Sequence, residues 1–308
     1  MGDIFSIKSR LKRLIYTTTR AAIKEEFLSI RKDIQEELSH ISRQLDITQN
    51  ELHSHIDWTQ RDILIVLQRA LQASPQPSIR CITDYPVAYD SPDHIHPIGT
   101  LNDHTRCPRF IKACERLFPH KKRLSFLDLG CSAGGIVWDA VLGGHIGIGL
   151  EGSNISLLQQ RAEWRLLPDN LFTCDISKPF ALVDEHNKPW QFDVVSAWEV
   201  LEHLTEDGLH MLFKNLTQIM KPESFFFCSV SLIDGGTTDD GLPLHQTIQP
   251  YEWWKEFIYN NGFKVVNPLP IKREDFARGN GHSSIYYREN TSYRENPGDC
   301  ILFALQRK

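Results

Sequence analysis

The segment FLDLGCSAGG, residues 126–135, places the strongest constraint on what this chain can fold into. An apolar run of strand length ends at Asp128 and is followed at once by Gly130, Gly134 and Gly135, after which a helix is expected. Glycines at a strand-to-helix turn let the backbone approach a ligand closely. The spacing G-x-x-x-G-G differs from the dinucleotide fingerprint, and the lysine of a phosphate-binding P-loop is missing. The carboxylate of Asp128 at the mouth of the loop is also unfavourable for a phosphate. The loop therefore predicts a cofactor with a positively charged group and no phosphates.

Short apolar runs alternate with helical stretches from Leu124 onward. The runs are SFLDLG, IGIGLE, LFTCDI, FDVVSAW and SFFFCSVSLI. This alternation predicts an α/β fold with a doubly wound, mostly parallel sheet and helices on both faces. Glu151 ends the second run, 21 residues after Gly130, where an acid suits the two hydroxyls of a ribose. Residues 79–123 are expected to be irregular apart from a short helix at Arg109–Phe118.

These motifs resemble those of the class I S-adenosylmethionine (SAM) dependent methyltransferases. The glycine loop is similar to the family motif D-x-G-x-G-x-G, with Ser132 in place of the middle glycine. The resemblance covers residues 124–308 and implies a Rossmann-like sheet of seven strands, whose last strand, GDCILFALQRK, is antiparallel. It also implies SAM as the cofactor, with Glu151 on the ribose and Asp175 on the adenine amine. The expected cofactor-binding residues are Asp128, Gly130, Cys131, Gly134, Glu151, Gly152, Asp175, Ile176 and Trp198.

The stretch WEVLEHL carries Glu199, Glu202 and His203, which share one face if a helix begins there. With His245 from a later segment, they form a candidate ligand set for Mg²⁺ or Mn²⁺. A similar E-x-x-E-H holds a metal in the small-RNA 2′-O-methyltransferases, and a similar string occurs in the ubiquinone-pathway O-methyltransferases. The alternative is a hydrogen-bonded structural cluster at the floor of the site.

Methyl transfer to a hydroxyl is helped by a general base, which makes His203 and His245 the candidate catalytic residues. We expect residues 79–110 and the segment between Ile233 and Trp254 to form the acceptor pocket, because both are rich in hydrogen-bonding side chains. They favour a hydroxyl on a sugar or another polar small molecule, as in the similar bacterial glycan and secondary-metabolite O-methyltransferases. The alternatives are a metal-dependent RNA 2′-O-methyltransferase and a non-enzymatic coiled-coil scaffold with a SAM-binding fold.

Residues 1–73 differ from the rest of the chain, since they contain no proline and a single glycine, at position 2. Apolar residues recur there in steps of four, three and four, the rhythm of a coiled-coil seam, at Ile34, Leu38, Ile41 and Leu45. We expect a long helical arm that joins chains into a homo-oligomer; the alternative is an arm folded onto its own domain. The first 24 residues carry six Lys and Arg and one acid, so they form either a solvated helix end or a basic helix at a membrane surface.

Composition narrows the classes of function. The 308 residues include 34 Lys and Arg against 39 Asp and Glu, a formal charge of -5, which opposes a general nucleic-acid binder. Seven widely spaced cysteines without C-x-x-C argue against a disulfide framework. No apolar stretch reaches the ~20 residues of a membrane span, and no signal peptide is recognisable.

We expect a cytoplasmic or membrane-peripheral protein with a helical arm (1–73), a linker and acceptor-site lid (74–123) and a methyltransferase domain (124–308).

Overall fold

The computed structural model describes residues 8, 10, 28, 31–32, 34–45, 47–49, 75–95, 106–275 and 300–308. The chain divides into two compact units, Met1–Arg69 and Ala70–Lys308. In the first unit residues 34–45 are helical, and the side chains of the predicted seam are exposed. Most of the predicted arm, and nearly all of the basic segment 1–24, lie outside the described residues. No helix in the described ranges is long and apolar enough to cross a bilayer.

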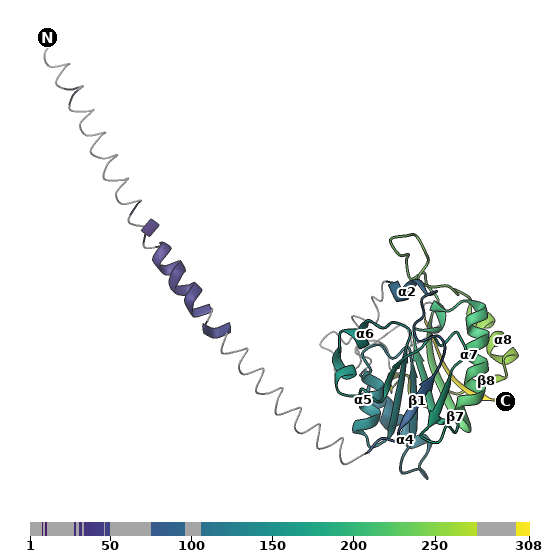
Figure 1. The fold of residues 1–308 in the computed structure, drawn as a ribbon. Helices are drawn as coiled ribbons and strands as arrows, with labels where there is room; N and C mark the ends of the chain where they lie inside the picture. The colour runs from purple at the N-terminus through teal and green to yellow at the C-terminus, as the bar shows by residue number, and fades with distance from the viewer. Residues whose placement is uncertain are drawn as a thin grey trace. The chain divides into compact units, whose positions relative to one another are not determined.

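A seven-stranded sheet forms the centre of the second unit (Figure 1). The strand order is β4-β3-β2-β6-β7-β9-β8. Neighbours from β4 to β7 run parallel, whereas β9 is antiparallel to both β7 and β8. The strands are β2 (Ser125–Leu129), β3 (Ile146–Glu151), β4 (Leu171–Thr173), β6 (Phe192–Trp198), β7 (Met220–Ser231), β8 (Phe263–Val265) and β9 (Cys300–Arg307). The predicted mostly parallel sheet and its antiparallel last strand are confirmed.

Helices cover both faces of this sheet. Side chains on successive strand residues point to opposite faces, so neighbouring residues of β2 pack against different helices. Phe126 packs in one hydrophobic cluster with residues of α4 (Pro108–Leu117) and α5 (Gly135–Leu142). Leu127 packs in the other cluster with residues of α7 (Glu206–Ile219) and α8 (Tyr251–Asn260). Thr205 caps α7 by accepting the Gly208 N–H at 3.2 Å. The shorter helices are α2 (Pro92–Ile95), α6 (Ile155–Leu158), η1 (Ala162–Arg165), η2 (Leu201–His203) and η3 (Arg273–Asp275).

A second, two-stranded sheet was not expected. β1 (Ile79–Ile82) pairs antiparallel with β5 (Ala181–Asp184), so the prediction that residues 79–123 are irregular is wrong at its start. The run IRCI has too few residues to show a strand pattern by itself, and its partner lies about 100 residues further along the chain. The short helix predicted at Arg109–Phe118 is confirmed as α4, which begins one residue earlier with a proline in its first turn.

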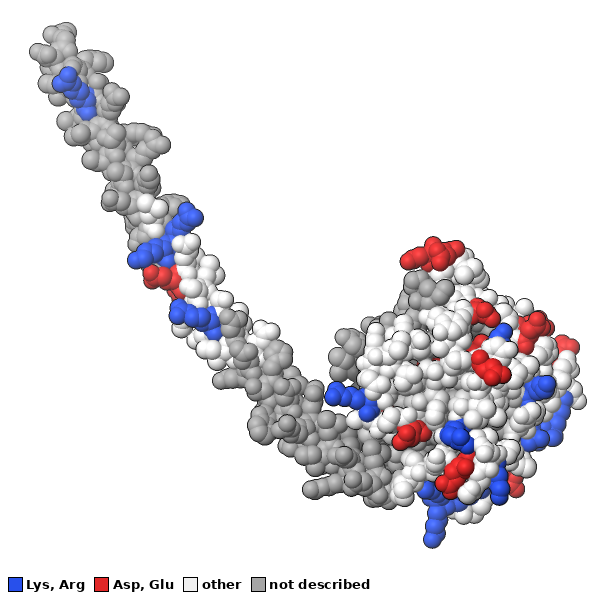
Figure 2. Space-filling model, viewed as in Figure 1, with Lys and Arg blue, Asp and Glu red and all other residues white. Residues whose placement is uncertain are grey.

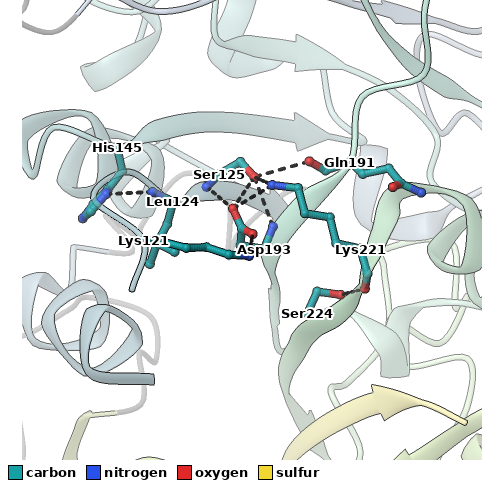
Figure 3. Close-up of polar contacts among 8 residues, drawn as sticks. All are labelled: Lys121, Leu124, Ser125, His145, Gln191, Asp193, Lys221 and Ser224. Carbon is teal, nitrogen blue, oxygen red and sulfur yellow. Dashed lines mark hydrogen bonds and ion pairs between the residues drawn. The ribbon is translucent and has the colours of Figure 1, made fainter. Parts of the chain in front are cut away.

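A buried carboxylate ties several strands together at the amino end of β2 (Figure 3). Asp193, 1% exposed, accepts from Lys121 Nζ at 2.6 Å and from Lys221 Nζ at 2.9 Å. The Ser125 amide and hydroxyl also donate to it, at 2.9 and 2.8 Å. Burial raises the pKa of Asp193, but the hydrogen bonds from both lysines and Ser125 outweigh burial and hold that pKa below its ordinary value. This network stabilises the end of the sheet opposite the glycine loop.

Candidate active site

A cavity of about 420 Å³ lies at the carboxyl ends of β2, β3, β4 and β6. The direction of strand order reverses between β2 and β6, and ligands of open α/β sheets bind at such a point. Of the nine expected cofactor-binding residues, six line the cavity: Gly130, Glu151, Gly152, Asp175, Ile176 and Trp198. The structure therefore brings together residues from four strand ends that the sequence indicated only one by one.

The glycine loop has little room for side chains. Gly130 and Gly134 have φ angles of 65° and 91°, in the left-handed region that favours glycine. A Cβ atom on Gly130 would lie 2.5 Å from Val200 Cγ2, and one on Gly134 would lie 2.7 Å from Leu171 Cδ1. The loop backbone is thus packed closely from behind and fixed in place.

Ser132, which stands where the family motif has glycine, also adopts a left-handed φ, 49°. Arg161 donates to its hydroxyl at 3.1 Å, and the Trp164 indole N–H donates to its carbonyl at 2.8 Å. Arg161 immediately precedes η1 and Trp164 lies in it, so this part of the chain holds the serine in place. Sequence reasoning identified the departure from the motif but missed Arg161 and Trp164, because they follow no spacing rule relative to the loop.

Glu151 is the buried acid at the end of β3. Its Oε2 accepts the Ser132 N–H at 2.7 Å, and its Oε1 accepts the Ser153 N–H at 3.0 Å. Burial raises the pKa of Glu151, and the two amide hydrogen bonds oppose that shift. These two amides fix the orientation of the carboxylate, and Glu151 lines the cavity.

Asp175 follows β4 and forms a tight local turn. Its Oδ1 accepts from the Ser177 amide at 2.9 Å and from the Ser177 hydroxyl at 2.6 Å. Its own N–H donates to the Tyr85 carbonyl at 2.9 Å. Asp175 and the neighbouring Ile176 both line the cavity.

Three expected cofactor residues lie behind the cavity wall instead of lining it. Asp128 is buried, and its Oδ1 accepts from Ser196 Oγ at 2.6 Å, which joins β2 to β6. Cys131 is buried against Gly149, and burial raises the pKa of its thiol well above the ordinary value. Gly134 packs against Leu171. These residues shape the loop from behind.

Two imidazoles meet at the other end of the cavity. The rings of His203 and His245 make an edge-to-face contact with centroids 4.8 Å apart. His203 Nδ1 lies 3.1 Å from the Leu244 carbonyl oxygen, and His245 Nδ1 lies 2.7 Å from that of Ile233. A carbonyl oxygen only accepts, so each Nδ1 is the donor and each Nε2 is the acceptor of the neutral ring. Burial lowers the pKa of His203, which favours the neutral imidazole.

Glu202, His203 and His245 form a cluster in which one candidate ligand atom of each lies within 4.8 Å of the others. Glu199 is outside this cluster, because no α-helix begins there and the condition for a shared face is not met. Glu199 has a φ of 54°, and only a three-residue helix, η2, follows it. Its Oε1 accepts from the Cys300 thiol at 3.7 Å. Glu202 is fully buried and accepts the Ser231 N–H at 2.8 Å, so it also has a structural role.

A strap of residues 85–95 forms one wall of the cavity. The Ala88 N–H donates to the Gly152 carbonyl at 2.9 Å, in addition to the bond between Asp175 and Tyr85. The strap carries Asp93, whose Oδ2 lies 4.0 Å from His203 Nδ1. The polar composition of this stretch and of the segment after Ile233 predicted that both would form walls of the pocket. Residues of both line the cavity: Ala88, Asp90–His94, Gly235 and Leu244–Gln246.

Charge in the cavity is predominantly negative. Its carboxylates are Asp90, Asp93, Glu151, Asp175 and Glu199. Lys178 is the single Lys or Arg among the described lining residues, and its Nζ lies 3.3 Å from Asp90 Oδ2. A cavity of this charge suits a cationic or neutral ligand better than an anion.

A family model described as "Methyltransferase domain" matches residues 103–274. No curated protein matches the chain. The mitomycin 7-O-methyltransferase MmcR is similar in structure, with 15% sequence identity and a TM-score of 0.38. The similarity covers 64% of this chain and 54% of MmcR, so the chain spans about half the length of MmcR. A SAM-dependent methyltransferase from Clostridium acetobutylicum has 11% identity and a TM-score of 0.44, over 65% of this chain and 91% of the other. A SAM-dependent methyltransferase from Bacteroides fragilis, solved in complex with S-adenosyl-L-homocysteine, has 14% identity and a TM-score of 0.37, over 63% of this chain and 76% of the other.

Proposed function

Because this chain belongs to the methyltransferase-domain family, we propose that it transfers the methyl group of SAM to a hydroxyl of a sugar or another polar small molecule. One observation carries the proposal: a single cavity is lined by the glycine loop, by two strand-end carboxylates and by two imidazoles. The carboxylates are those of Glu151 and Asp175, and the imidazoles are those of His203 and His245.

The residues at one end of the cavity fit SAM. Glu151, oriented by two amides, accepts from the ribose hydroxyls, and Asp175 accepts from the adenine amine beside Ile176. SAM supplies a methyl group made electrophilic by a sulfonium, and its positive charge suits a cavity with five carboxylates. The closely packed loop at Gly130 lets the cofactor contact the backbone directly.

The residues at the other end fit a hydroxyl acceptor. His203 and His245 present their Nε2 atoms as proton acceptors, since both Nδ1 atoms donate to carbonyl oxygens. Either imidazole then takes the acceptor proton as the oxygen attacks the methyl carbon. The strap and the segment after Ile233 hold the acceptor in line, and such positioning supplies much of the rate enhancement.

The charge of the cavity argues against RNA as the acceptor. Nucleic-acid binding depends on Lys and Arg that neutralise phosphates. Lys178 is already paired with Asp90, and the face shown in Figure 2 carries Lys, Arg, Asp and Glu intermixed on the second unit. A neutral, hydroxyl-rich acceptor is therefore favoured over the RNA alternative.

A metal-assisted variant of the reaction is the second candidate, and the Glu202, His203 and His245 cluster favours it. Histidines whose Nδ1 donates to a backbone carbonyl are typical metal ligands, because that bond orients the ring. A site with one carboxylate and two imidazoles suits Mn²⁺ better than Mg²⁺. Glu202, His203 and His245 would hold the ion, which would supply Lewis-acid polarisation of the acceptor hydroxyl, and the imidazoles would then not serve as the base.

Calorimetry of S-adenosylhomocysteine binding tests the cofactor assignment. The protein is first treated with a chelator, then titrated without added metal, with Mg²⁺ and with Mn²⁺. Micromolar binding in all conditions supports the cofactor site, and heat from a metal titration supports the second candidate. The exposed turn residue Glu185 provides a control variant, Glu185→Ala, that should bind normally. If no condition gives binding, the cofactor proposal fails and the scaffold alternative takes its place.

Release of S-adenosylhomocysteine tests the reaction. Free sugars and glycosides are compared with their phosphate esters as acceptors, and we expect turnover with the uncharged members. His203→Asn and His245→Asn should bind the cofactor normally and lose turnover. Unchanged turnover in both variants would exclude a base or a metal at this position.

A further inference from the structure

Ile34, Leu38, Ile41 and Leu45, four exposed apolar residues of the arm, occupy two heptad positions, whereas Leu28 and Ile47 lie outside the seam at e and c. A step of three leads from position a to position d, and a step of four leads from d to a. Leu38 and Leu45 therefore occupy a, whereas Ile34 and Ile41 occupy d. In chain order, from Ile34 to Leu45, these four side chains are 54%, 61%, 48% and 64% exposed. The described helix thus presents a regular apolar seam of leucine and isoleucine.

We infer that this seam binds further copies of the same chain and assembles three or four chains rather than two. In parallel coiled coils, β-branched residues at a with leucine at d favour two strands, and leucine at a with isoleucine at d shifts the preference to three or four. Residues 34–45 have the second arrangement at all four seam positions. β-Branched side chains are stiff, so the packing geometry at each layer selects the number of strands.

The residues that flank the seam agree with an assembly of more than two helices. The flanking e and g positions are Gln35, Glu37, Ser42, Gln44 and Gln49, of which one is charged. In a bundle of three or four helices these positions lie partly inside the interface, where an unpaired charge is costly. The charged residues lie mainly on the outer positions b and f, where Lys32 Nζ and Glu36 Oε1 are 3.7 Å apart.

The same helix has a physical reason to associate. A helix of three or four turns is marginal in water, and most helices in proteins are stabilised by packing of an apolar face. The sequence extends the seam with Phe27 at d and Leu52 at a, whereas Arg31 at a and Thr48 at d weaken it. A bundle of identical helices buries all copies of the seam at once.

The mass of the full-length protein in solution, measured by light scattering after size exclusion, tests this inference. We expect three or four times the chain mass of 35.5 kDa. Leu38→Asp with Ile41→Asp should reduce it to one chain, because two buried seam layers would become charged. Ser39→Asp with His40→Asp, at the outer positions b and c, should leave it unchanged. A monomer or a dimer of the unaltered protein, or an assembly that survives the seam substitutions, would overturn the inference.

An exchange of the two residue types gives a sharper test. Ile34→Leu, Leu38→Ile, Ile41→Leu and Leu45→Ile keep the composition and place isoleucine at a and leucine at d. We expect this variant to form a dimer. An unchanged mass would show that the a and d residues do not determine the number of chains. Calorimetry of S-adenosylhomocysteine binding on the same samples shows whether the second unit is intact, so failure of the seam and failure of the proposed function are distinguished.

Discussion

The carboxylate of Glu151 accepts the backbone N–H of Ser132 at 2.7 Å, so the tip of β3 holds the glycine loop that follows β2. The second oxygen of the same carboxylate holds the Ser153 amide at 3.0 Å. The acid that we propose for the ribose is therefore also a structural support for the glycine loop. Its removal should affect both binding and stability.

Glu151→Ala is expected to weaken S-adenosylhomocysteine binding and also to lower the free energy of unfolding, each by about 1–3 kcal/mol. Two buried amides lose their acceptor, which adds a stability cost that a purely cofactor-binding acid would not have. Calorimetry and urea unfolding measure the two effects. Weaker binding with unchanged stability would show that the two amides find other partners.

Asp175→Ala is expected to weaken S-adenosylhomocysteine binding by about 1–3 kcal/mol, roughly 5- to 150-fold. The reason is the loss of the acceptor for the adenine amine. S-inosylhomocysteine, which has an oxygen in place of that amine, provides the matched ligand. The unaltered protein should prefer the adenosyl ligand, and the variant should lose that preference. Equal preference in both proteins would place the adenine elsewhere.

Gly130→Ala is expected to destabilise the second unit, because the added Cβ would lie 2.5 Å from Val200 Cγ2. The left-handed φ of 65° adds a strain of about 1–2 kcal/mol for any L side chain. Val200→Ala removes the clash but not the strain, so the double variant should be partly rescued. A double-mutant cycle of unfolding free energies measures the coupling. Strict additivity would contradict the packing described for the loop.

Asp193→Asn is expected to cost about 2–3 kcal/mol at pH 7, less than a fully buried pair because both lysines are partly exposed. The pKa of Asp193 is lowered in the folded protein. Its ionised carboxylate therefore stabilises the folded state at pH values above the unfolded pKa, near 3.9, and this stabilisation is lost as the pH falls through the folded pKa. The stability difference from the unaltered protein should be constant between pH 7 and 5 and shrink below about pH 4. Asp169→Asn, at an exposed position, is the control.

The sequence predicted the central sheet because its strands are continuous apolar runs buried on both faces, as β2 and β6 are. It did not predict β1, whose four residues become a strand only through pairing with a distant segment. The amino end of β7 was also missed, because Lys221, Pro222 and Glu223 are unusual strand residues. Local sequence pattern identifies strands that are continuous apolar runs. It misses short or polar strand segments that are defined by pairing with a distant part of the chain.

For the candidate site, the sequence indicated residues at strand ends, and six of the nine line one cavity because parallel strands place their carboxyl ends at one edge. The side-chain directions were not predictable: Asp128 points to Ser196 on the next strand, and Glu199 lies in a left-handed conformation outside the acidic and imidazole cluster. Such details depend on contacts between segments that are far apart in the chain. His203 and His245, 42 residues apart, meet for the same reason.

The strap of residues 85–95 lies outside the range that the family model matches. The family match spans residues 103–274, yet Tyr85 and Ala88, which bond to the tips of β4 and β3, precede it, and β9 follows it. A fragment trimmed to the match would lose one wall of its own cavity and the strand between β7 and β8. The unit that forms the cavity therefore includes residues on both sides of the matched range.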